Sequence, residues 1–235
     1  MFPERFSNLP AYAFPRLRAL LDAHAPGGPV VNMTIGEPKH AFPDWVPQVL
    51  AENVGGFSVY PPNEGTPELL QNISDWIARR YDVSVGPDRI MTLNGSREGL
   101  YNAAMALLPE TKSGKTPTIL IPNPFYQVYM IGALSVAAEP VFVPATRQNG
   151  FLPDYGSLPA DVLDRTTAAY ICSPANPQGA VADRGYWRDL IALAEKHDFR
   201  IFSDECYSEI YRDAPPPGIL EVARRLAQVA RSPGQ

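Results

Sequence analysis

The chain has 235 residues, of which 45% are hydrophobic and 19% are charged, and its formal net charge is −5. These values are typical of a globular protein with a substantial core. The basic residues are scattered rather than grouped in a stripe or on one helical face, which argues against a nucleic-acid partner and against a membrane surface. Because no signal-peptide pattern and no apolar run of ~20 residues is present, a cytoplasmic protein without membrane spans is expected.

The first 44 residues are predicted to form an N-terminal arm, with a short helix near Phe14–Ala23 followed by an extended segment. A second helix is predicted over Pro43–Asn53. An amphipathic helix is predicted over Pro67–Tyr81, because its apolar residues recur at the spacing of one helical face.

From residue 89 the pattern becomes an alternation of strands and helices. The strand-like runs are short, apolar and without polar alternation, which is typical of a parallel sheet covered on both faces. The sequence therefore predicts an α/β fold, with a three-layer α/β/α arrangement around a mostly parallel sheet. The predicted strands are Arg89–Leu93, Thr118–Ile121, Pro140–Val143, Ala168–Cys172 and Arg200–Ser203, and the predicted helices are Glu98–Leu108, Tyr126–Ala138 and Tyr186–His197.

The two cysteines, Cys172 and Cys206, lie in or beside strand-like runs and match no metal-binding spacing. We expect buried free thiols in a reducing compartment. The three histidines are far apart in the sequence, so no metal site is expected.

Polar or aromatic residues follow four of the five predicted strands. Ligands of an open parallel sheet bind beyond the carboxyl ends of the strands, so these residues are candidates for a binding site. Asn94, Gly95, Ser96 and Arg97 follow the first strand, directly before a helix. Glycine allows close approach of the backbone, and the free N–H groups of a helix start attract an anion, so a phosphate cup is one interpretation. The other is that Asn94 or Ser96 caps the helix.

The next two candidates are an aromatic residue and an amide. Tyr126, in the segment NPFY, is positioned either to stack on a planar heterocycle or to pack on the core at a helix start. Asn176, in the segment SPANPQG, lies in a turn with two prolines, and the bond before Pro177 is a candidate for the cis form. Asn176 is expected to donate a hydrogen bond into a cleft, unless the segment is only a rigid surface turn.

Asp204 and Glu205 follow the last predicted strand, and Cys206 and Tyr207 come next. Two acids at the mouth of an apolar strand are costly if they are buried without partners, which indicates a specific role. A carboxylate there can bind Mg²⁺ or pair with a cationic ring nitrogen. The ring nitrogen is favoured, because the chain has no GxxxxGK[ST] phosphate loop.

Together these strand ends offer an anion cup, a stacking ring, an amide, a carboxylate and a phenol. Pyridoxal 5′-phosphate (PLP) presents a phosphate, a flat pyridine ring, a phenolate oxygen and a ring nitrogen that can be protonated. The two sets of groups match one another, so the residues favour PLP as the ligand.

The chain also resembles a known family. The ordered segments IGEP, NGSREG, NPFY, SPANPQG and SDECYSEIY, with Tyr60 and Gly65 after the first, resemble the class I/II aminotransferases of PLP fold type I. Within that family, IGEPKH, SREGLYNAA, NPFYQVY and NGFLPD are most similar to the succinyldiaminopimelate aminotransferases of bacterial lysine biosynthesis. The resemblance implies PLP as cofactor, amino-group transfer between an amino acid and a 2-oxo acid, and a homodimer with shared active sites.

The resemblance implies a role for each matching residue. Gly36 would lie over the substrate carboxylate, and Tyr60 would reach the cofactor phosphate of the neighbouring subunit. Asp204 would pair with the pyridine nitrogen. The other cofactor-binding residues would be Gly95, Ser96 and Arg97 at the phosphate, Tyr126 on the ring, and Asn176 and Tyr207 at the ring oxygen O3′.

The sequence departs from the family pattern in one respect. The family's Schiff-base lysine lies in an SxxK-type segment a few dozen residues after DECY, and no lysine of this chain has such a context. We therefore expect residues 1–44 to form the arm with part of the small domain, and residues 45–235 to form an incomplete PLP-binding large domain. Such a chain is expected to be poorly soluble and inactive alone, so no catalytic residue is assigned.

Three other functions are compatible with parts of the pattern. Another PLP enzyme of the same fold, such as a C–S lyase or an aminocyclopropane-carboxylate synthase, would share the cofactor residues. A non-catalytic PLP-fold module would need a DNA-binding segment to act as a regulator, and the sequence has no sign of one. A nucleotide-binding domain is disfavoured, because neither GxGxxG nor a phosphate loop is present.

Overall fold

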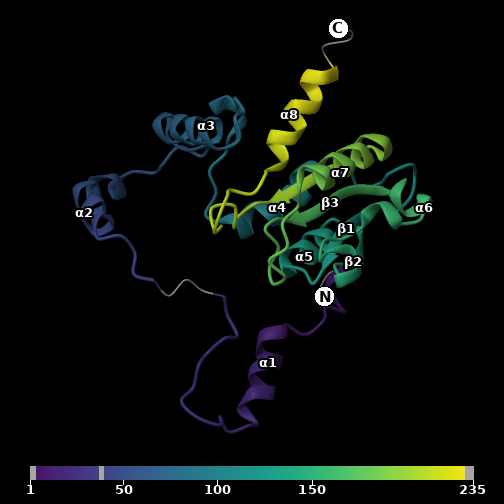
Figure 1. Ribbon diagram of the computed structural model, residues 1–235, viewed down its shortest axis with the longest axis horizontal. Coiled ribbons are helices and arrows are strands. Elements are labelled where there is room, and N and C mark those ends of the chain that lie inside the picture. Colours follow the sequence, from purple (N-terminus) through teal and green to yellow (C-terminus); the bar gives the residue numbers. More distant parts are fainter. Residues whose placement is uncertain (1–3, 37–39, 231–235) are drawn as a thin grey trace. The chain divides into compact units, whose positions relative to one another are not determined.

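The computed structural model describes residues 4–36 and 40–230 (Figure 1). The chain divides into two compact units, residues 7–62 and a larger unit formed mainly by the chain from Asn63 onward. The helices are α1 (Ala13–Asp22), α2 (Trp45–Glu52), α3 (Pro67–Tyr81), α4 (Ser96–Leu107), α5 (Gln127–Ser135), α6 (Ala160–Leu163), α7 (Arg184–His197) and α8 (Ile219–Ala230). The strands are β1 (Thr118–Asn123), β2 (Glu139–Pro144), β3 (Thr166–Cys172) and β4 (Arg200–Asp204), and short 3₁₀ helices are η1 (Glu4–Phe6), η2 (Val54–Ser58), η3 (Pro87–Arg89), η4 (Arg147–Asn149) and η5 (Tyr155–Ser157).

The smaller unit contains the two predicted helices of the N-terminal region, α1 and α2, within a few residues of their expected bounds. Neither helix has a buried residue. Apolar side chains such as Trp45 and Tyr60 are exposed. The predicted assignment of residues 1–44 and 45–235 to different domains stays a prediction.

The larger unit is built on a four-stranded sheet with the order β2-β1-β3-β4, in which every neighbouring pair is parallel. Helix α5 connects β1 to β2, and α7 connects β3 to β4. The predicted α/β fold with a parallel sheet is therefore confirmed. Because the strands are parallel, their carboxyl ends meet at one edge of the sheet.

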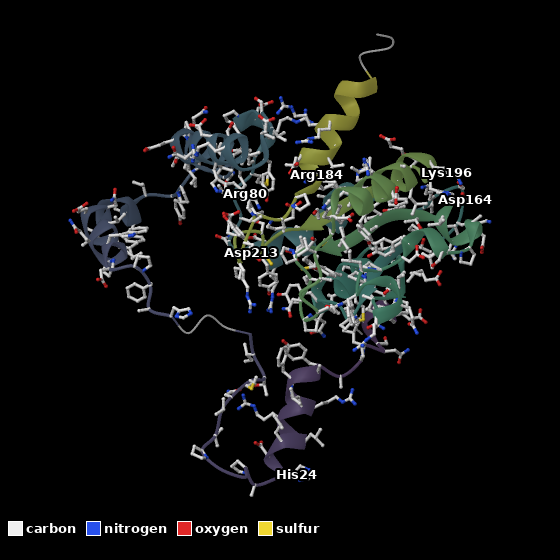
Figure 2. All side chains as sticks on the ribbon, viewed as in Figure 1. His24, Arg80, Asp164, Arg184, Lys196 and Asp213 are labelled. Atoms are coloured by element: carbon white, nitrogen blue, oxygen red, sulfur yellow. The ribbon has the colours of Figure 1, made fainter. Side chains whose placement is uncertain are left out.

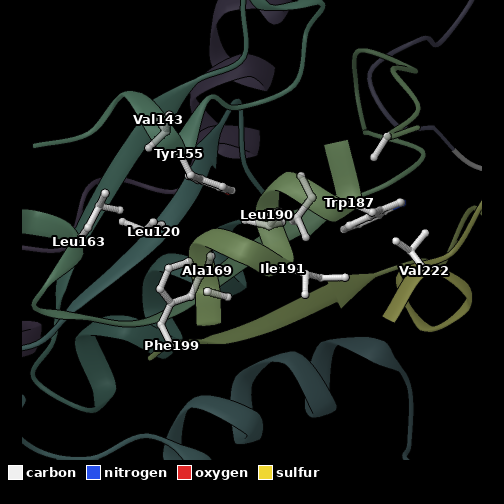
Figure 3. Packing of buried hydrophobic residues seen from close by; sticks show 13 residues of the cluster. Leu120, Val143, Tyr155, Leu163, Ala169, Trp187, Leu190, Ile191, Phe199 and Val222 are labelled. Atoms are coloured by element: carbon white, nitrogen blue, oxygen red, sulfur yellow. The ribbon is translucent and has the colours of Figure 1, made fainter. Parts of the chain in front are cut away.

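Helices cover both faces of the sheet, and the side chains of each strand alternate between these faces. Leu120, Ala169 and Ile171 pack with Trp187 of α7 in the cluster drawn in Figure 3. On the other face, Ile119, Ile121, Ala168 and Tyr170 form a second cluster with residues of α5, among them Tyr129, Met130 and Ala133. This arrangement gives the predicted three layers.

Local sequence accounts for the ends of the two long helices. Helix α3 begins after Thr66, whose side chain accepts a hydrogen bond from the Leu69 amide at 3.3 Å. Helix α7 begins after Asp183, whose carboxylate accepts from the Tyr186 amide at 2.7 Å. Each helix ends at an aspartate in the left-handed conformation, a residue type that tolerates it. Among the described residues, no helix is long and apolar enough to cross a membrane.

The predicted strand at Arg89–Leu93 is wrong. Arg89 ends the 3₁₀ helix η3, and the following residues are not part of the sheet. The backbone N–H of Thr92 donates to the carbonyl of Glu64 in a loop, at 3.2 Å, rather than to a strand. Met91 and Leu93 are 68% and 49% exposed. An apolar run becomes a strand only if a neighbouring strand satisfies its backbone groups, and none of the described strands lies beside this one.

Candidate functional site

Asp204 is the last residue of β4 and lies at the carboxyl edge of the sheet, where its side chain is buried at 7% exposure. The Tyr129 hydroxyl donates to its Oδ2 at 2.6 Å, and the Cys206 backbone N–H lies 3.3 Å from its Oδ1. Both partners are neutral. Within the described residues no ion pair joins Asp204 to a lysine, arginine or histidine. Burying a carboxylate without a positive charge is costly, so a cationic ligand group would complete this site.

Tyr129 of α5 holds the carboxylate in place. Its ring is 1% exposed and stacks on Tyr170 of β3, with 4.6 Å between the ring centroids and 13° between the planes. Burial raises the pKa of the Tyr129 hydroxyl far above its usual value, and the charge of Asp204 raises it further. The hydroxyl therefore keeps its proton and acts as a donor. Sequence reasoning missed this residue because it lies in an apolar helical run, although it follows Tyr126 by three residues and so lies near it on the helix surface.

Tyr126 immediately precedes α5 and is tied to the start of α4. Its hydroxyl accepts a hydrogen bond from Nε of Arg97 at 2.6 Å, and the Arg97 guanidinium lies 5.6 Å from the ring centroid. The Tyr126 and Tyr129 rings meet edge to face at 5.9 Å. Arg97, Tyr126, Tyr129 and Asp204 thus form one continuous chain of contacts along the carboxyl edge.

The start of α4 is open in the way that an anion site requires. Gly95 precedes the helix with φ = 119°, a conformation that strongly favours glycine, and no side chain caps the helix. Ser96 is the exposed first residue. The alternative prediction, that the side chain of Asn94 or Ser96 caps the helix, is therefore wrong. Instead, the backbone N–H of Asn94 donates to the Glu98 carboxylate at 2.8 Å. The amides at the beginning of a helix lack intrahelical partners and attract negative charge.

Asn176 and Tyr207 meet on the other side of Asp204. Nδ2 of Asn176 donates to the Tyr207 hydroxyl at 3.0 Å. The bond between Asn176 and Pro177 is cis, as the sequence suggested. Burial raises the pKa of Tyr207, although the hydrogen bond from Asn176 opposes this shift.

Glu205 has a different role from Asp204, although the sequence predicted a specific role for the two acids together. Its carboxylate accepts from the Tyr81 hydroxyl at 3.1 Å, the Ser203 hydroxyl at 2.8 Å and the Ile219 amide at 3.1 Å. These donors belong to α3, β4 and the start of α8. Glu205 therefore joins three elements of the fold, and its hydrogen bonds account for its burial.

The cysteines lie at the same edge. Cys172 ends β3 and is half-buried, whereas Cys206 is exposed, and both thiols are free. The prediction of two buried thiols is therefore wrong for Cys206, because the chain leaves the sheet after Asp204 and turns at its rim. Among the described residues, no group of three or more histidine, cysteine or acidic residues is arranged to hold a metal ion.

The described lysines lie at the opposite, amino edge. The Lys112 ammonium donates to the carbonyls of Thr166 at 2.6 Å and Asp198 at 2.7 Å, and also to that of His197. Lys115 pairs with Lys112 just before β1. Lys196 lies in the last turn of α7, which ends at His197, whose ring contacts Asp164 at 2.9 Å (Figure 2). Lys39 lies outside the described residues.

Two predicted residues lie in the smaller unit. Gly36 and Tyr60 belong to residues 7–62, and Tyr60 is fully exposed. Their predicted roles at the substrate carboxylate and at a neighbouring subunit's phosphate stay predictions.

A parallel sheet covered by helices on both faces, with an uncapped helix start, aromatic rings and a buried carboxylate at its carboxyl edge, defines an α/β cofactor-binding domain. Residues 28–233 match the family described as aminotransferase class I and II, and the chain belongs to this family. Enzymes of this family depend on PLP.

The similarity to known relatives and to a solved structure agrees with this family assignment. The chain is 35% identical over 225 residues to an LL-diaminopimelate aminotransferase of Desulforudis audaxviator (strain MP104C), a match that covers 94% of this chain and 56% of the relative. It is 34% identical to the LL-diaminopimelate aminotransferase of Moorella thermoacetica, covering 97% of this chain and 60% of the relative. An aminotransferase structure from Neisseria meningitidis Z2491 superposes with a TM-score of 0.88 at 37% identity, over 96% of this chain and 58% of that one. The chain thus spans a little over half the length of these proteins.

Proposed function

We propose that the chain binds PLP at the carboxyl edge of the sheet, as part of an enzyme that transfers an amino group between an amino acid and a 2-oxo acid. The observation that carries the proposal is the buried Asp204 carboxylate, which has neutral donors alone among the described residues. A protonated pyridine nitrogen is the kind of cation that this site lacks, because it is planar, carries a single N–H donor and fits beside a stacking ring.

The remaining cofactor contacts follow from the neighbouring residues. The open start of α4, with Gly95, Ser96 and Arg97, would hold the phosphate. Tyr126 is 37% exposed, so part of its ring is available to stack on the pyridine. The hydrogen-bonded pair of Asn176 and Tyr207 would bind the ring oxygen O3′.

Asp204 has an electronic as well as a binding role in this proposal. When it is bound, the cofactor supplies a sink for the electrons left at the substrate Cα after a proton is lost. The Asp204 carboxylate would keep a proton on the ring nitrogen, and the Tyr129 hydroxyl would hold that carboxylate in one orientation. Burial strengthens both interactions, because little water competes at this edge.

The 235-residue chain alone is proposed to be inactive in transamination. A lysine must reach the cofactor from the carboxyl edge, and the described lysines, Lys112, Lys115 and Lys196, lie at the amino edge. Lys39 has no SxxK-type context.

The relatives named above suggest the substrate of the whole enzyme. They are LL-diaminopimelate aminotransferases, so we propose diaminopimelate or its N-succinyl form as the amino donor, with a 2-oxo acid as acceptor, in lysine biosynthesis. In the same proposal, Gly36 contacts the substrate carboxylate, and Tyr60 acts across the interface of a homodimer.

Titration with pyridoxamine 5′-phosphate tests the cofactor site. This form carries an amine instead of an aldehyde, so it cannot react with surface lysines, and its fluorescence reports non-covalent binding. We expect saturable binding to one site per chain, and weaker binding of dephosphorylated pyridoxamine. Asp189→Asn, which removes an exposed acid of α7, serves as the matched control for Asp204→Asn. Binding that is absent, or that is equally strong after Asp204→Asn, would contradict the proposal.

A further inference from the structure

Cys172 and Cys206 are 34 positions apart in the sequence, but both lie beside Asp204 at the carboxyl edge of the sheet. Cys172 is the register partner of Asp204 across the parallel strands β3 and β4. Paired residues of neighbouring strands point to the same face, so the side chains of Cys172 and Asp204 are neighbours at the carboxyl edge. Cys206 follows Asp204 by two residues, and its backbone N–H faces the Asp204 carboxylate.

Contacts with a third residue support this placement. Tyr129, which bonds Asp204 from the covering helix α5, interacts electrostatically with both cysteine side chains. The two thiols also influence each other's titration, because Cys206 lowers the pKa of Cys172 and Cys172 raises that of Cys206. The Cys172 thiol itself donates to the Pro174 carbonyl at 3.2 Å. The register, the turn after β4 and the helix above therefore place both cysteines next to Asp204.

We propose that Cys172 and Cys206 form an oxidisable thiol pair that closes into a disulfide at the rim of the site when the protein meets a peroxide. In the first step the Cys172 thiolate attacks one oxygen of hydrogen peroxide, which breaks the O–O bond and leaves a sulfenic acid and hydroxide. In the second step the Cys206 sulfur attacks the Cys172 sulfur, displaces hydroxide and forms the S–S bond. The two thiols lose two electrons and two protons, and the peroxide is reduced to two molecules of water.

The surroundings assign the two sulfurs to these roles. The Cys206 thiol, together with the Asn176 backbone N–H and the Tyr129 hydroxyl, lowers the pKa of Cys172, although burial and the Asp204 charge oppose this. The same interaction raises the pKa of Cys206, which stays a thiol until it resolves the sulfenic acid. A low pKa makes a cysteine the preferred site of peroxide attack, and a neighbouring thiol diverts the product to a disulfide.

The disulfide also affects the cofactor site, an extension that rests on the proposed function. An S–S bond would draw the Cys206 side chain towards β3 and shift the backbone N–H that faces Oδ1 of Asp204. Oxidation is then expected to weaken the binding of pyridoxamine 5′-phosphate, and reduction to restore it. By linkage, bound cofactor should disfavour the disulfide at equilibrium by the same factor by which oxidation weakens cofactor binding.

The chain offers a clean test, because it contains only two cysteines. Any intramolecular disulfide must join Cys172 to Cys206. The reduced protein is treated with hydrogen peroxide, and thiol titration and non-reducing peptide mass spectrometry follow. We expect loss of both thiols, a monomeric product lighter by two hydrogen atoms, and a cross-linked peptide pair. Cys172→Ser and Cys206→Ser should each abolish this product.

A second measurement uses the unaltered chain, so it does not depend on the folding of a variant. Equilibration with glutathione buffers measures how readily the two thiols form a disulfide with each other, expressed as the effective concentration of one thiol around the other. The measurement is made on the folded protein in water and on the unfolded protein in urea. We expect a value roughly 10-fold or more higher in the folded protein. Equal values, persistence of both thiols after peroxide, or a product that is only sulfinic acid or an intermolecular disulfide would overturn the proposal. Neither thiol measurement uses the cofactor, so these outcomes are separate from a failure to bind pyridoxamine 5′-phosphate.

Discussion

At the amino edge of the sheet the Lys112 ammonium donates to backbone carbonyls at 2.6 and 2.7 Å, whereas at the carboxyl edge the Asp204 carboxylate accepts from neutral groups, the Tyr129 hydroxyl and the Cys206 N–H. Lys112 connects the starts of β3 and β4, and carbonyl oxygens stabilise its charge. Asp204 is more deeply buried than Lys112, and no ion pair joins it to a basic residue within the described chain.

The charged residues at the two edges of the sheet therefore have different roles. The chain itself supplies all the partners that Lys112 needs, so the amino edge contributes to stability. At the carboxyl edge, Asp204 has no ionic partner among the described residues, which is the property expected of a binding site. Substitutions at the two edges should separate these effects, because one set should change stability and the other should change ligand affinity.

The largest effect is expected from Asp204→Asn. This change keeps the shape of the side chain but removes the charge that would pair with the ring nitrogen, so pyridoxamine 5′-phosphate should bind about 100-fold more weakly, or ~2.7 kcal/mol. Fluorescence titration measures the affinity. Stability should fall little or rise, because the variant no longer buries an uncompensated charge. If Asp204→Asn lowered the stability and left the affinity unchanged, Asp204 would be a structural residue and the contrast between the two edges would be wrong.

Lys112→Met should affect stability alone. The methionine keeps most of the aliphatic stem but leaves carbonyls of Thr166 and His197 without their donor, so the free energy of unfolding should fall by ~2 kcal/mol. Urea denaturation measures this change. Lys196→Met is the control, because Lys196 is exposed and its loss should stay within about 0.5 kcal/mol. Affinity for pyridoxamine 5′-phosphate should be unchanged in both variants.

Tyr129→Phe should produce a smaller effect at the carboxyl edge. The variant keeps the ring that stacks on Tyr170 but removes the donor to Asp204, so cofactor affinity should fall about 10-fold, or ~1.4 kcal/mol. Tyr186→Phe is the matched control, since its hydroxyl donates to the neutral carbonyl of Pro153 at 2.8 Å. Equal affinities for the two variants would show that Tyr129 does not orient the carboxylate.

The smallest effect concerns the pH dependence of Cys172. Because the Cys206 thiol lowers the pKa of Cys172, alkylation of Cys172 by iodoacetamide should persist to lower pH than alkylation of an ordinary cysteine. Cys206→Ala removes the donor, so the pKa should rise and the rate at neutral pH should fall roughly 3- to 10-fold. Peptide-resolved mass spectrometry measures the rate at each pH. A profile that is the same in both proteins would show that Cys206 does not stabilise the thiolate.

The sequence by itself determined the elements that depend on local pattern. The apolar period of Pro67–Tyr81 predicted α3 with its observed bounds, and the alternation of apolar runs with helices predicted the parallel sheet. Such patterns are reliable because each element has to bury one face, and that requirement is written in a short stretch of residues. The motif positions also predicted that Tyr126, Asn176 and Asp204 end or follow strands, and they do. Arg97 was expected to follow a strand that does not form, and it reaches this edge through its hydrogen bond to Tyr126.

Only the tertiary structure decided which groups became partners. Residues 90–93 are apolar enough for a strand, yet no described strand lies beside them, so they are not part of the sheet. The bond from Tyr129 to Asp204 spans 75 positions and depends on how α5 packs over the sheet, while the placement of Cys172 beside Asp204 depends on the register of β3 and β4. Periodicity fixes which face a side chain occupies, but register and helix packing determine what it meets there, and those are set by contacts distant in sequence.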